Sequence, residues 1–508
     1  MKTTRREFLR TSICLGAGLA VLGCGASNIS IPGSELPANF QPPILTSVNG
    51  RLTTTLQCIC ADNTLNNGRR AYTRTYNGQL VGPTLRIRPG DTMDITVQND
   101  LPKSEFADPF CAPGPEETGD ENVPNSFSTT NLHVHGLHVS PEGISDNVLR
   151  EMEPGGSYPV KIEVPADHPG GTNWYHPHRH GAASMQMFGG MMGALIIESE
   201  LDRQPEIAAA ADLVMVISEL RLTVQGMTPP VFSLAAFEGA TNTSFITING
   251  LVNPTIRLRP GEIQRWRLIQ GCVSNFALLR LEGHRFMVLA KDGLTYPHPV
   301  WLDELLIVPG ERYDVLVKGG NPGTYSLQKA DDSLVNSGLS ILGPIATVEV
   351  TGDPMDMPYP EGPLAGGERE PILDDEIVRR REIVFDVEAS PRGEPRFLID
   401  GKQFSHDRID HVFALDTAEE WQIKNLNNGF GHPFHIHTND FLVTAVNDTP
   451  LDPPIWMDTV LIPPPQADGT PGSVTVRSRF EDFRGKGVIH CHILDHEDLG
   501  MMQLWEIV

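Results

Sequence analysis

The chain has 508 residues, enough for about three domains of ordinary size. Its 48 Gly and 42 Pro indicate many turns, while a hydrophobic content of 40% supplies buried cores and argues against a disordered or collagen-like chain. The formal net charge of -25 argues against nucleic acid as a partner, since polyanions are bound by clustered Lys and Arg. Small cations and neutral molecules are better suited.

The first residues are predicted to be an export signal rather than part of the fold. Arg5 and Arg6 are followed by an apolar run, residues 13–22, which is too short to span a bilayer as a permanent helix. Residues 1–24 therefore indicate export by a twin-arginine signal to the periplasm or the exterior.

The end of this apolar run has a second feature. Residues 21–24 read Val-Leu-Gly-Cys and resemble a lipoprotein cleavage site, although Leu22 is larger than the usual residue there. Two outcomes stay open, a lipid anchor at Cys24 or ordinary cleavage near Ala26. The rest of the chain has no long apolar stretch, so we expect membrane contact only through such an anchor.

Five cysteines follow the leader, an odd number for a protein bound for an oxidising compartment. They are Cys58, Cys60, Cys111, Cys272 and Cys491. Cys58 and Cys60 alternate on one expected strand and are poorly placed to pair with each other. We therefore expect at most two disulfides, and more readily one or none, with one cysteine serving another purpose.

A sequence motif recurs along the chain. Residues 77–91 return as residues 249–262 in the same order of Asn-Gly, Pro-Thr, alternating apolar and basic residues, and Pro-Gly-acid. A fainter copy occupies residues 400–425. Alternation with period two between turns is typical of half-buried antiparallel strands, so the copies predict three related β domains, each a sandwich or Greek-key barrel.

We place these domains at residues 40–205, 206–352 and 376–508. Residues 353–375 are rich in Pro, Gly and Asp and are predicted to be an exposed linker without a strand. Helical periodicity is scarce, and further strands are expected at 158–164, 194–198, 213–217, 313–317 and 474–477.

Four short clusters contain ten of the 17 histidines. Side chains at i and i+2 of a strand point to the same face, so each His-x-His pair directs two imidazoles into one space. One such pair could lie on the surface, but eight imidazoles buried together without a metal would leave many polar atoms unsatisfied. A metal centre is therefore predicted at His133, His135, His176, His178, His435, His437, His490 and His492.

The last cluster indicates a second site. Cys491 points away from its neighbours His490 and His492, so one strand supplies two sites on opposite faces. Cys491, His496, Met501 and the earlier His432 together make a thiolate, two imidazoles and a thioether. This set is typical of blue-copper electron-transfer centres, whereas a structural zinc site would not require the Met.

These motifs and the domain repeat resemble the three-domain multicopper oxidases, of the laccase and bilirubin oxidase kind, over nearly all of the chain beyond the leader. The resemblance implies an all-β fold of three cupredoxin-like Greek-key β-sandwich domains and four copper ions. It implies type 1 copper at His432, Cys491, His496 and Met501, type 2 copper at His133 and His435, and a type 3 pair at His135, His176, His178, His437, His490 and His492.

The implied reaction couples one-electron oxidation of a reductant near His432 to four-electron reduction of dioxygen to water. Electrons would pass through Cys491 to a three-copper cluster between the first and third domains. Asp146 and Glu497 match positions that supply protons in relatives, and a solvated or structural acid is the alternative for each.

Substrate choice is open within the family. Phenols or aryl amines are our first expectation, and cuprous, ferrous or manganous ion the second, because an acidic surface attracts cations. Phe430 departs from the Trp of bilirubin oxidases, which disfavours bilirubin. A non-turnover copper-binding or electron-transfer protein would leave the eight histidines unexplained, and a copper-free envelope scaffold should have lost ligands. We expect a monomer.

Other residues near the motifs are interpreted more plainly. His138 and His180 lie outside the register of the ligands and are expected beside them or on the surface, and five scattered histidines are expected to be structural: His168, His284, His298, His406 and His411. Met185, Met187, Met191 and Met192 could bind cuprous ion, but core packing is the better explanation.

Overall fold

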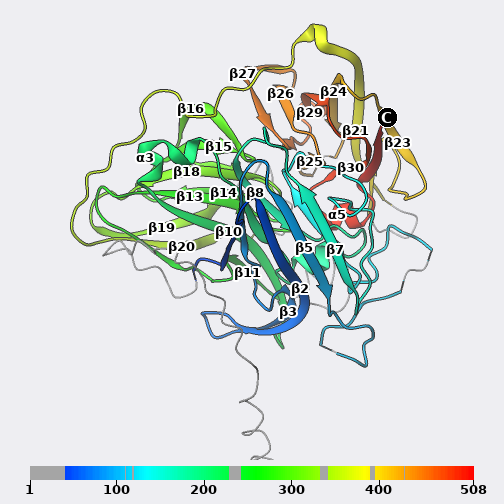
Figure 1. The fold of residues 1–508 in the computed structure, drawn as a ribbon, viewed down its shortest axis with the longest axis horizontal. Helices are drawn as coiled ribbons and strands as arrows, with labels where there is room; N and C mark the ends of the chain where they lie inside the picture. Colours follow the sequence, from blue (N-terminus) through cyan, green and yellow to red (C-terminus); the bar gives the residue numbers. More distant parts are fainter. Residues whose placement is uncertain are drawn as a thin grey trace, which may run out of the picture.

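The computed structural model describes residues 40–108, 110–116, 119–227, 242–331, 341–389, 395–427 and 429–508. The export signal predicted for residues 1–24, with the candidate anchor Cys24, lies outside this part of the chain. No helix within these ranges is long and apolar enough to cross a membrane. The fold is mostly β, with six sheets that form three cupredoxin-like sandwiches (Figure 1).

The first sandwich pairs a sheet of order β1-β4-β9-β8-β6 with one of order β3-β2-β5-β7. Its strands are β1 (Ile44–Thr46), β2 (Arg51–Thr64), β3 (Arg70–Tyr76), β4 (Thr84–Ile87), β5 (Thr92–Asn99), β6 (His133–His135), β7 (Ser157–Glu163), β8 (Gly171–His176) and β9 (Gly193–Ile197). β5 shows the expected alternation, since Met93, Ile95 and Val97 are buried and the residues between them are not.

The second sandwich contains sheets of order β11-β10-β13-β18-β15-β16 and β12-β20-β19-β14-β17. Its strands are β10 (Ala211–Thr223), β11 (Asn242–Ile248), β12 (Thr255–Leu258), β13 (Ile263–Gln270), β14 (Ala277–Leu281), β15 (Phe286–Lys291), β16 (Leu294–Leu302), β17 (Leu305–Ile307), β18 (Arg312–Lys318), β19 (Gly323–Ala330) and β20 (Gly343–Val350).

The third sandwich contains sheets of order β22-β21-β24-β29-β26-β27 and β23-β31-β30-β25-β28. Its strands are β21 (Ile377–Ala389), β22 (Pro395–Ile399), β23 (Ile409–Phe413), β24 (Thr417–Asn425), β25 (His432–Ile436), β26 (Phe441–Val446), β27 (Thr449–Met457), β28 (Thr459–Ile462), β29 (Gly472–Phe480), β30 (Gly485–Cys491) and β31 (Met502–Ile507). The five strands expected at 158–164, 194–198, 213–217, 313–317 and 474–477 are all present, and β10 extends furthest beyond its prediction.

The recurring motif forms the same turn in each sandwich. Asn77, Asn249 and Asp400 have φ of 54°, 52° and 51°, and the Gly that follows each also has positive φ. Two successive residues with positive φ are the requirement of a tight hairpin turn, which explains the repeated Asn-Gly and Asp-Gly pairs. The repeat therefore reflects a shared local structure.

Helices are short. Those in the described residues are α2 (Ala183–Met187), α3 (Pro205–Ala208), α5 (Leu494–Asp498) and the 3₁₀ turns η1 (Leu201–Arg203) and η2 (Asp374–Glu376). α2 and the loop after it bury all four methionines of residues 185–192 in a core cluster or beside one, so the prediction of core packing is confirmed.

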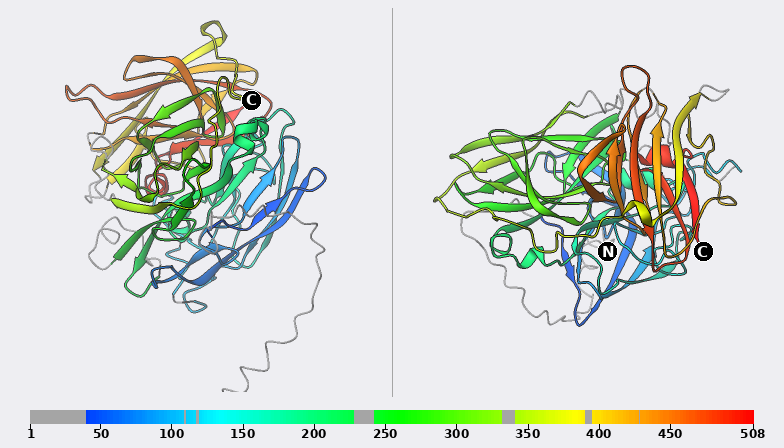
Figure 2. Two further views of the ribbon diagram at one scale, coloured as in Figure 1. Left: turned by 90° about the vertical axis from the view of Figure 1, so that its left-hand side faces the viewer. Right: turned by 90° about the horizontal axis from the view of Figure 1, so that it is seen from above.

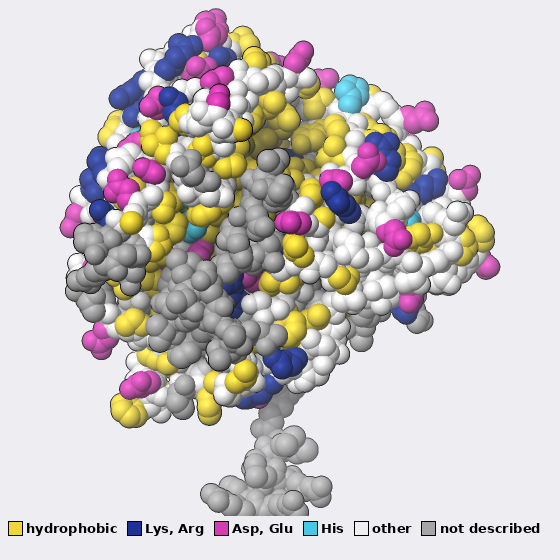
Figure 3. Space-filling model, turned by 180° about the vertical axis from the view of Figure 1, so that it is seen from behind, with side chains coloured by type: hydrophobic (Ala, Val, Ile, Leu, Met, Phe, Trp, Pro, Cys, Tyr) yellow, Lys and Arg dark blue, Asp and Glu magenta, His cyan; other side chains and the backbone are white. Residues whose placement is uncertain are grey.

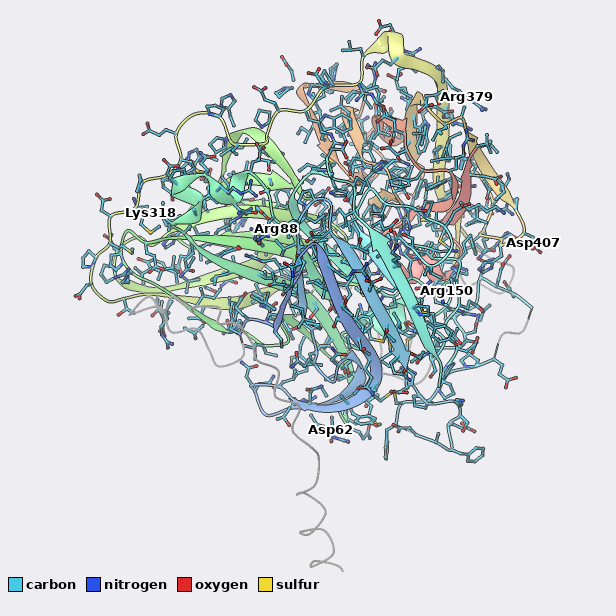
Figure 4. The ribbon with its side chains drawn as sticks, viewed as in Figure 1. Asp62, Arg88, Arg150, Lys318, Arg379 and Asp407 are labelled. Carbon is cyan, nitrogen blue, oxygen red and sulfur yellow. A yellow bond between two sulfur atoms is a disulfide. The ribbon has the colours of Figure 1, made fainter. Side chains whose placement is uncertain are left out.

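The three sandwiches surround a common centre. In Figure 1 the second domain (green) lies to the left, the third (yellow to red) at the upper right and the first (blue to cyan) below, and Figure 2 shows the same three-lobed arrangement from two further sides. The labelled side chains of Asp62, Lys318 and Arg379 lie at the periphery of the first, second and third domains in turn (Figure 4).

The connection between the second and third domains runs along the outer edge of the molecule (Figure 1). Residues 353–373 contain no strand, as expected, but the segment is not simply exposed. Met357 and Leu364 are buried in a cluster with Ile263 of the second domain, and Ile372 is buried against the third. Apolar residues between the Pro and Gly positions thus fasten the connection to both domains.

One disulfide, Cys60–Cys111, is present in the described chain. Cys58 and Cys60 do not pair with each other, as predicted, and Cys58, Cys272 and Cys491 are free and buried. Cys491 is thus available as a thiolate ligand.

Candidate metal centres

Cys491 ends β30 and faces the interior of the third sandwich. Its Sγ lies 3.4 Å from Nδ1 of His432, which begins the neighbouring strand β25, and 3.7 Å from Nδ1 of His496. The single turn of α5 returns His496 to the sulfur. The three side chains form one buried group suited to a metal ion, and this face corresponds to the predicted type 1 set.

Met501 lies in the same apolar cluster as Cys491. Its carbonyl oxygen accepts a hydrogen bond from the Cys491 N–H at 3.0 Å, and its own N–H donates to the His496 carbonyl at 2.9 Å. The loop between Cys491 and Met501 therefore folds back and holds the thioether residue beside the thiol.

Burial favours the uncharged forms of these side chains, the thiol of Cys491 and the neutral imidazole of His432. It raises the pKa of the Cys491 thiol well above its usual value and lowers the pKa of His432 to about 3. The rings of Phe397 and His496 stack with their centroids 4.0 Å apart. The ring of the half-buried Phe430 lies with its centroid 5.2 Å from those of both His432 and His496. A soft cation would compensate the thiolate that this apolar enclosure otherwise disfavours.

On the opposite face of β30, His490 and His492 join the other six imidazoles in a buried cluster between the first and third domains. The Nε2 atoms of His178, His437 and His490 lie 3.1–3.3 Å from one another. Neutral imidazoles offer lone pairs, and three such atoms at this separation repel one another unless a cation lies among them.

Backbone carbonyls select the tautomer of several of these rings. Nδ1 of His176, His435 and His490 lies 3.0, 2.8 and 3.0 Å from the carbonyl oxygens of Pro177, Asp458 and Cys491. A hydrogen bond from Nδ1–H leaves Nε2 as the metal-binding atom. Nε2 of His176 and of His435 is buried without another partner, as a ligand atom awaiting a metal would be.

The cluster is electrostatically adapted to a cation other than a proton. Burial, together with neighbouring imidazoles, holds the pKa of His133, His135, His437 and His492 well below the usual value. Neutral rings present lone pairs, so the donor set fits copper ions, which imidazole ligands suit.

Both acids suggested by the resemblance touch this cluster. Asp146 accepts from the Val134 N–H at 3.0 Å, and its Oδ2 lies 3.0 Å from Nδ1 of His133. Burial raises the pKa of Asp146 to about 8. The alternative of a solvated acid is wrong for this residue, which is buried against a candidate ligand.

Glu497 spans two other imidazoles. Its Oε1 lies 3.4 Å from Nδ1 of His178 and its Oε2 3.0 Å from Nδ1 of His490. Burial raises the pKa of Glu497 to about 7, an effect that His178 opposes. This acid too is buried rather than solvated.

Sequence reasoning missed Asp458. Its Oδ1 lies 3.2 Å from Nε2 of His135 and 3.8 Å from Nδ1 of His435, and the three form a further buried group with metal-ligating atoms close together. The available signal was an isolated acid within the apolar run of residues 455–462. A charge at such a position is rarely buried unless paired.

Several histidines outside the candidate ligand sets differ in burial and hydrogen bonding. His138 is partly exposed and His180 is buried beside the cluster, where neither of its ring nitrogens has a hydrogen-bond partner. His180 lines a small cavity together with His178 and His406. His168 and His411 are buried and hydrogen-bonded, in keeping with structural roles.

Comparison with known proteins matches three parts of the chain to the multicopper oxidase family: residues 60–107 with 121–202, residues 224–340, and residues 379–507. A multicopper oxidase of Staphylococcus haemolyticus is 27% identical over 435 residues, 84% of this chain and 82% of its own length. A laccase of Bacillus subtilis is 24% identical over 488 residues, 85% of this chain and 89% of its own.

Solved structures resemble the fold over nearly its whole length. A multicopper oxidase of Campylobacter jejuni, described as a metallo-oxidase, superimposes with a TM-score of 0.70 at 24% sequence identity. The superposition covers 93% of this chain and 96% of that one.

Proposed function

Since the chain belongs to the multicopper oxidase family, whose members are copper oxidoreductases that use dioxygen, we propose that it is laccase-like and oxidises phenols or aryl amines. The observation that carries the proposal is the two-faced strand β30, with Cys491 in one donor group and His490 and His492 in another.

Four copper ions fit the donor atoms. Type 1 copper is assigned to His432, Cys491, His496 and Met501, type 2 copper to His133 and His435, and the type 3 pair to His178, His437 and His490 on one side and His135, His176 and His492 on the other. Copper, when bound, supplies the one-electron chemistry that links oxidation of a reductant to reduction of dioxygen to water.

The surroundings of His432 favour an aromatic reductant. Phe430 and Phe397 pack against the two type 1 imidazoles, and Phe430 is partly accessible. Aromatic rings gain by stacking or edge contact with such side chains. The reductant would bind against this apolar edge.

Asp146 and Glu497 hold protons for the reduction of dioxygen. Each carboxyl group contacts an imidazole of the three-copper cluster and is shielded from bulk water. A positioned acid can deliver a proton inside a closed site, where solvent cannot.

Oxidation of cuprous, ferrous or manganous ion is the alternative, because the net charge of -25 attracts cations. On the face in Figure 3, however, acidic side chains are scattered among basic and apolar ones rather than gathered into one patch. A non-turnover copper-binding or electron-transfer protein is the second alternative, and it would need only the type 1 set.

The protein acts as an exported monomer. Arg5 and Arg6 with the apolar run after them support twin-arginine export to the periplasm or the exterior, with Cys24 as a candidate lipid anchor. Export is tested by fractionation of cells that produce either the full chain or its Arg5→Lys, Arg6→Lys variant, since the variant should stay in the cytoplasm.

Substrate class is tested with purified, copper-loaded protein by visible spectrum and dioxygen uptake. Phenols, aryl amines and the three metal ions serve as donors, and Cys491→Ser, which removes the thiolate, is the control. A strong blue band with higher turnover of the organic donors supports the proposal. Faster turnover of a metal ion favours the metallo-oxidase, and a band without uptake favours the electron carrier.

A further inference from the structure

Where the structure describes it, the second domain carries no candidate copper ligand, yet one of its side chains reaches the histidine cluster. Arg312 begins β18, is fully buried and projects into the junction of the three domains. Its guanidinium forms a bidentate pair with Asp458 of the third domain, with both Nη–Oδ distances at 2.7 Å. Paired donors in a rigid fork fix both the position and the plane of a carboxylate.

The remaining donors of Arg312 are also used. Nε donates to the Thr172 carbonyl at 3.1 Å, Nη2 to Oδ1 of Asn173 at 3.0 Å, and Nη1 to the Gly310 carbonyl at 3.2 Å. Thr172 and Asn173 belong to β8 of the first domain. Arg312 therefore connects all three domains and has no spare rotational freedom.

The room for this guanidinium is provided beside a candidate ligand. Gly136, which follows His135, has φ of +91°, and a Cβ on it would come 2.2 Å from Nη2 of Arg312. The positive φ and the close approach both require glycine here.

The fixed carboxylate acts on the cluster through His135. Oδ1 of Asp458 lies 3.2 Å from Nε2 of His135, so the proton of this ring resides on Nε2 and Nδ1 carries the lone pair. Nδ1 of His135 in turn faces Nε2 of His492 at 3.2 Å. His135 thus has the opposite tautomer to His176 and His490, whose Nδ1 atoms face carbonyl oxygens.

Asp292, a second residue of the same domain, forms hydrogen bonds with the backbone at Asp458. Oδ2 of Asp292 accepts from the N–H groups of Asp458 and Thr459 at 3.4 and 3.3 Å, and its Oδ1 accepts from the Arg312 N–H at 2.9 Å. The Asp458 carbonyl oxygen faces Nδ1 of His435 at 2.8 Å. Both ends of Asp458 are therefore positioned by the second domain.

We propose that Arg312 is a positioning residue for the three-copper cluster: by clamping Asp458 it sets the tautomer and orientation of His135 and His435, and so the copper affinity of their sites. The second domain, to which no copper is assigned, then positions ligands of the cluster in addition to separating the first and third domains. The inference rests on the copper assignment proposed above and is independent of the reductant. Loss of such an outer hydrogen-bond partner typically lowers metal affinity by about 10–100-fold.

The test compares Arg312→Met and Arg312→Lys with the wild type as copper-loaded holoenzymes. Total copper per blue type 1 centre and the ratio of type 2 to type 1 electron paramagnetic resonance signal are measured, followed by copper release to a chelator. Arg265→Met and Arg265→Lys are matched controls, since Arg265 is equally buried in the second domain but pairs with Asp202 and Asp314.

Arg312→Met is expected to keep the blue band, while the ratio of type 2 to type 1 signal and the copper content per type 1 centre both fall. The affinity for the copper that the chelator removes should be lower by about 10–100-fold. Arg312→Lys, which keeps the charge but not the fork, should be intermediate, and both Arg265 variants should match the wild type. If Arg312→Met does not fold, the type 2 signal of Arg312→Lys decides.

Unchanged type 2 signals and copper content in both Arg312 variants would overturn the inference. So would an equal loss of type 1 and type 2 signals in the variants, which a merely structural role produces. A wild-type protein that binds only type 1 copper would instead overturn the copper assignment itself.

Discussion

Nδ1 of His133 lies 3.0 Å from Oδ2 of Asp146, and both side chains are buried in the first domain. Asp146→Asn keeps an oxygen that can accept from the Val134 N–H but removes the group that carries a proton. We expect dioxygen turnover to fall about 100-fold or more, with an altered pH profile, while the blue band stays unchanged. Steady-state oxygen uptake from pH 4 to 9 checks this, and an unaltered profile at full turnover would assign Asp146 a structural role.

Gly310 brings the backbone of the second domain against the cluster. It has φ of +92°, and a Cβ on it would come 2.8 Å from Cδ2 of His492 and 3.2 Å from Cε1 of His135. Gly310→Ala should therefore destabilise the fold by about 1–3 kcal/mol and displace these two rings.

Gly469→Ala is the matched control, since Gly469 has φ of +87° and a Cβ on it would have no other atom within 4 Å. Urea unfolding of both variants separates backbone strain from steric contact. Equal losses of stability would mean that the contact with the cluster histidines contributes nothing.

His168 should make folding sensitive to acid. Its Nδ1 faces the Pro169 carbonyl at 2.7 Å and its Nε2 accepts from the His138 N–H at 2.9 Å, which requires the neutral ring. Burial lowers its folded-state pKa from 6.5 to about 4. The unfolded chain binds the proton first, so the contribution of His168 is full above pH 6.5 and is lost as the pH falls towards 4, to a total of about 3 kcal/mol.

His168→Gln removes this titration but can retain both hydrogen bonds. Unfolding free energies at pH 7.5, 6 and 5 should therefore decline less steeply in the variant than in the wild type. Parallel pH dependences in the two proteins would exclude His168 as a contributor.

The Cys60–Cys111 disulfide closes a loop with a sequence separation of 51 residues. Restricting the unfolded chain over a loop of this length is worth up to about 4 kcal/mol in the chain-entropy model. The double variant Cys60→Ser, Cys111→Ser should unfold at lower urea concentration, and a reducing agent should shift the wild type in the same direction. A variant as stable as the oxidised wild type would show that the bond contributes no stability.

Much of the candidate site was predictable because its signals are local. Strand alternation alone predicted that Cys491 points away from His490 and His492, and His496, predicted as a ligand of the same site, lies with its Nδ1 atom 3.7 Å from the sulfur. The turn residues Asn77, Asn249 and Asp400 likewise revealed three related domains, since positive φ is a property of single residues and their neighbours.

Other features had no local signature. The expected exposed linker contains buried Met357 and Leu364, because their burial depends on a surface of the second domain that the sequence does not reveal. Asp458 was overlooked because the role of a single acid depends on partners that are distant in the sequence.

The sequence by itself determined the two-faced strand, the four histidine motifs and the repeated sandwich, because each depends on the geometry of a few consecutive residues. Only the tertiary structure decided which ring nitrogens face the metal sites and how the second domain reaches them. Asp458 meets His135 across 323 positions and Arg312 across 146, and contacts between such distant residues leave no periodic pattern in the chain. They arise only when the three sandwiches pack around one point.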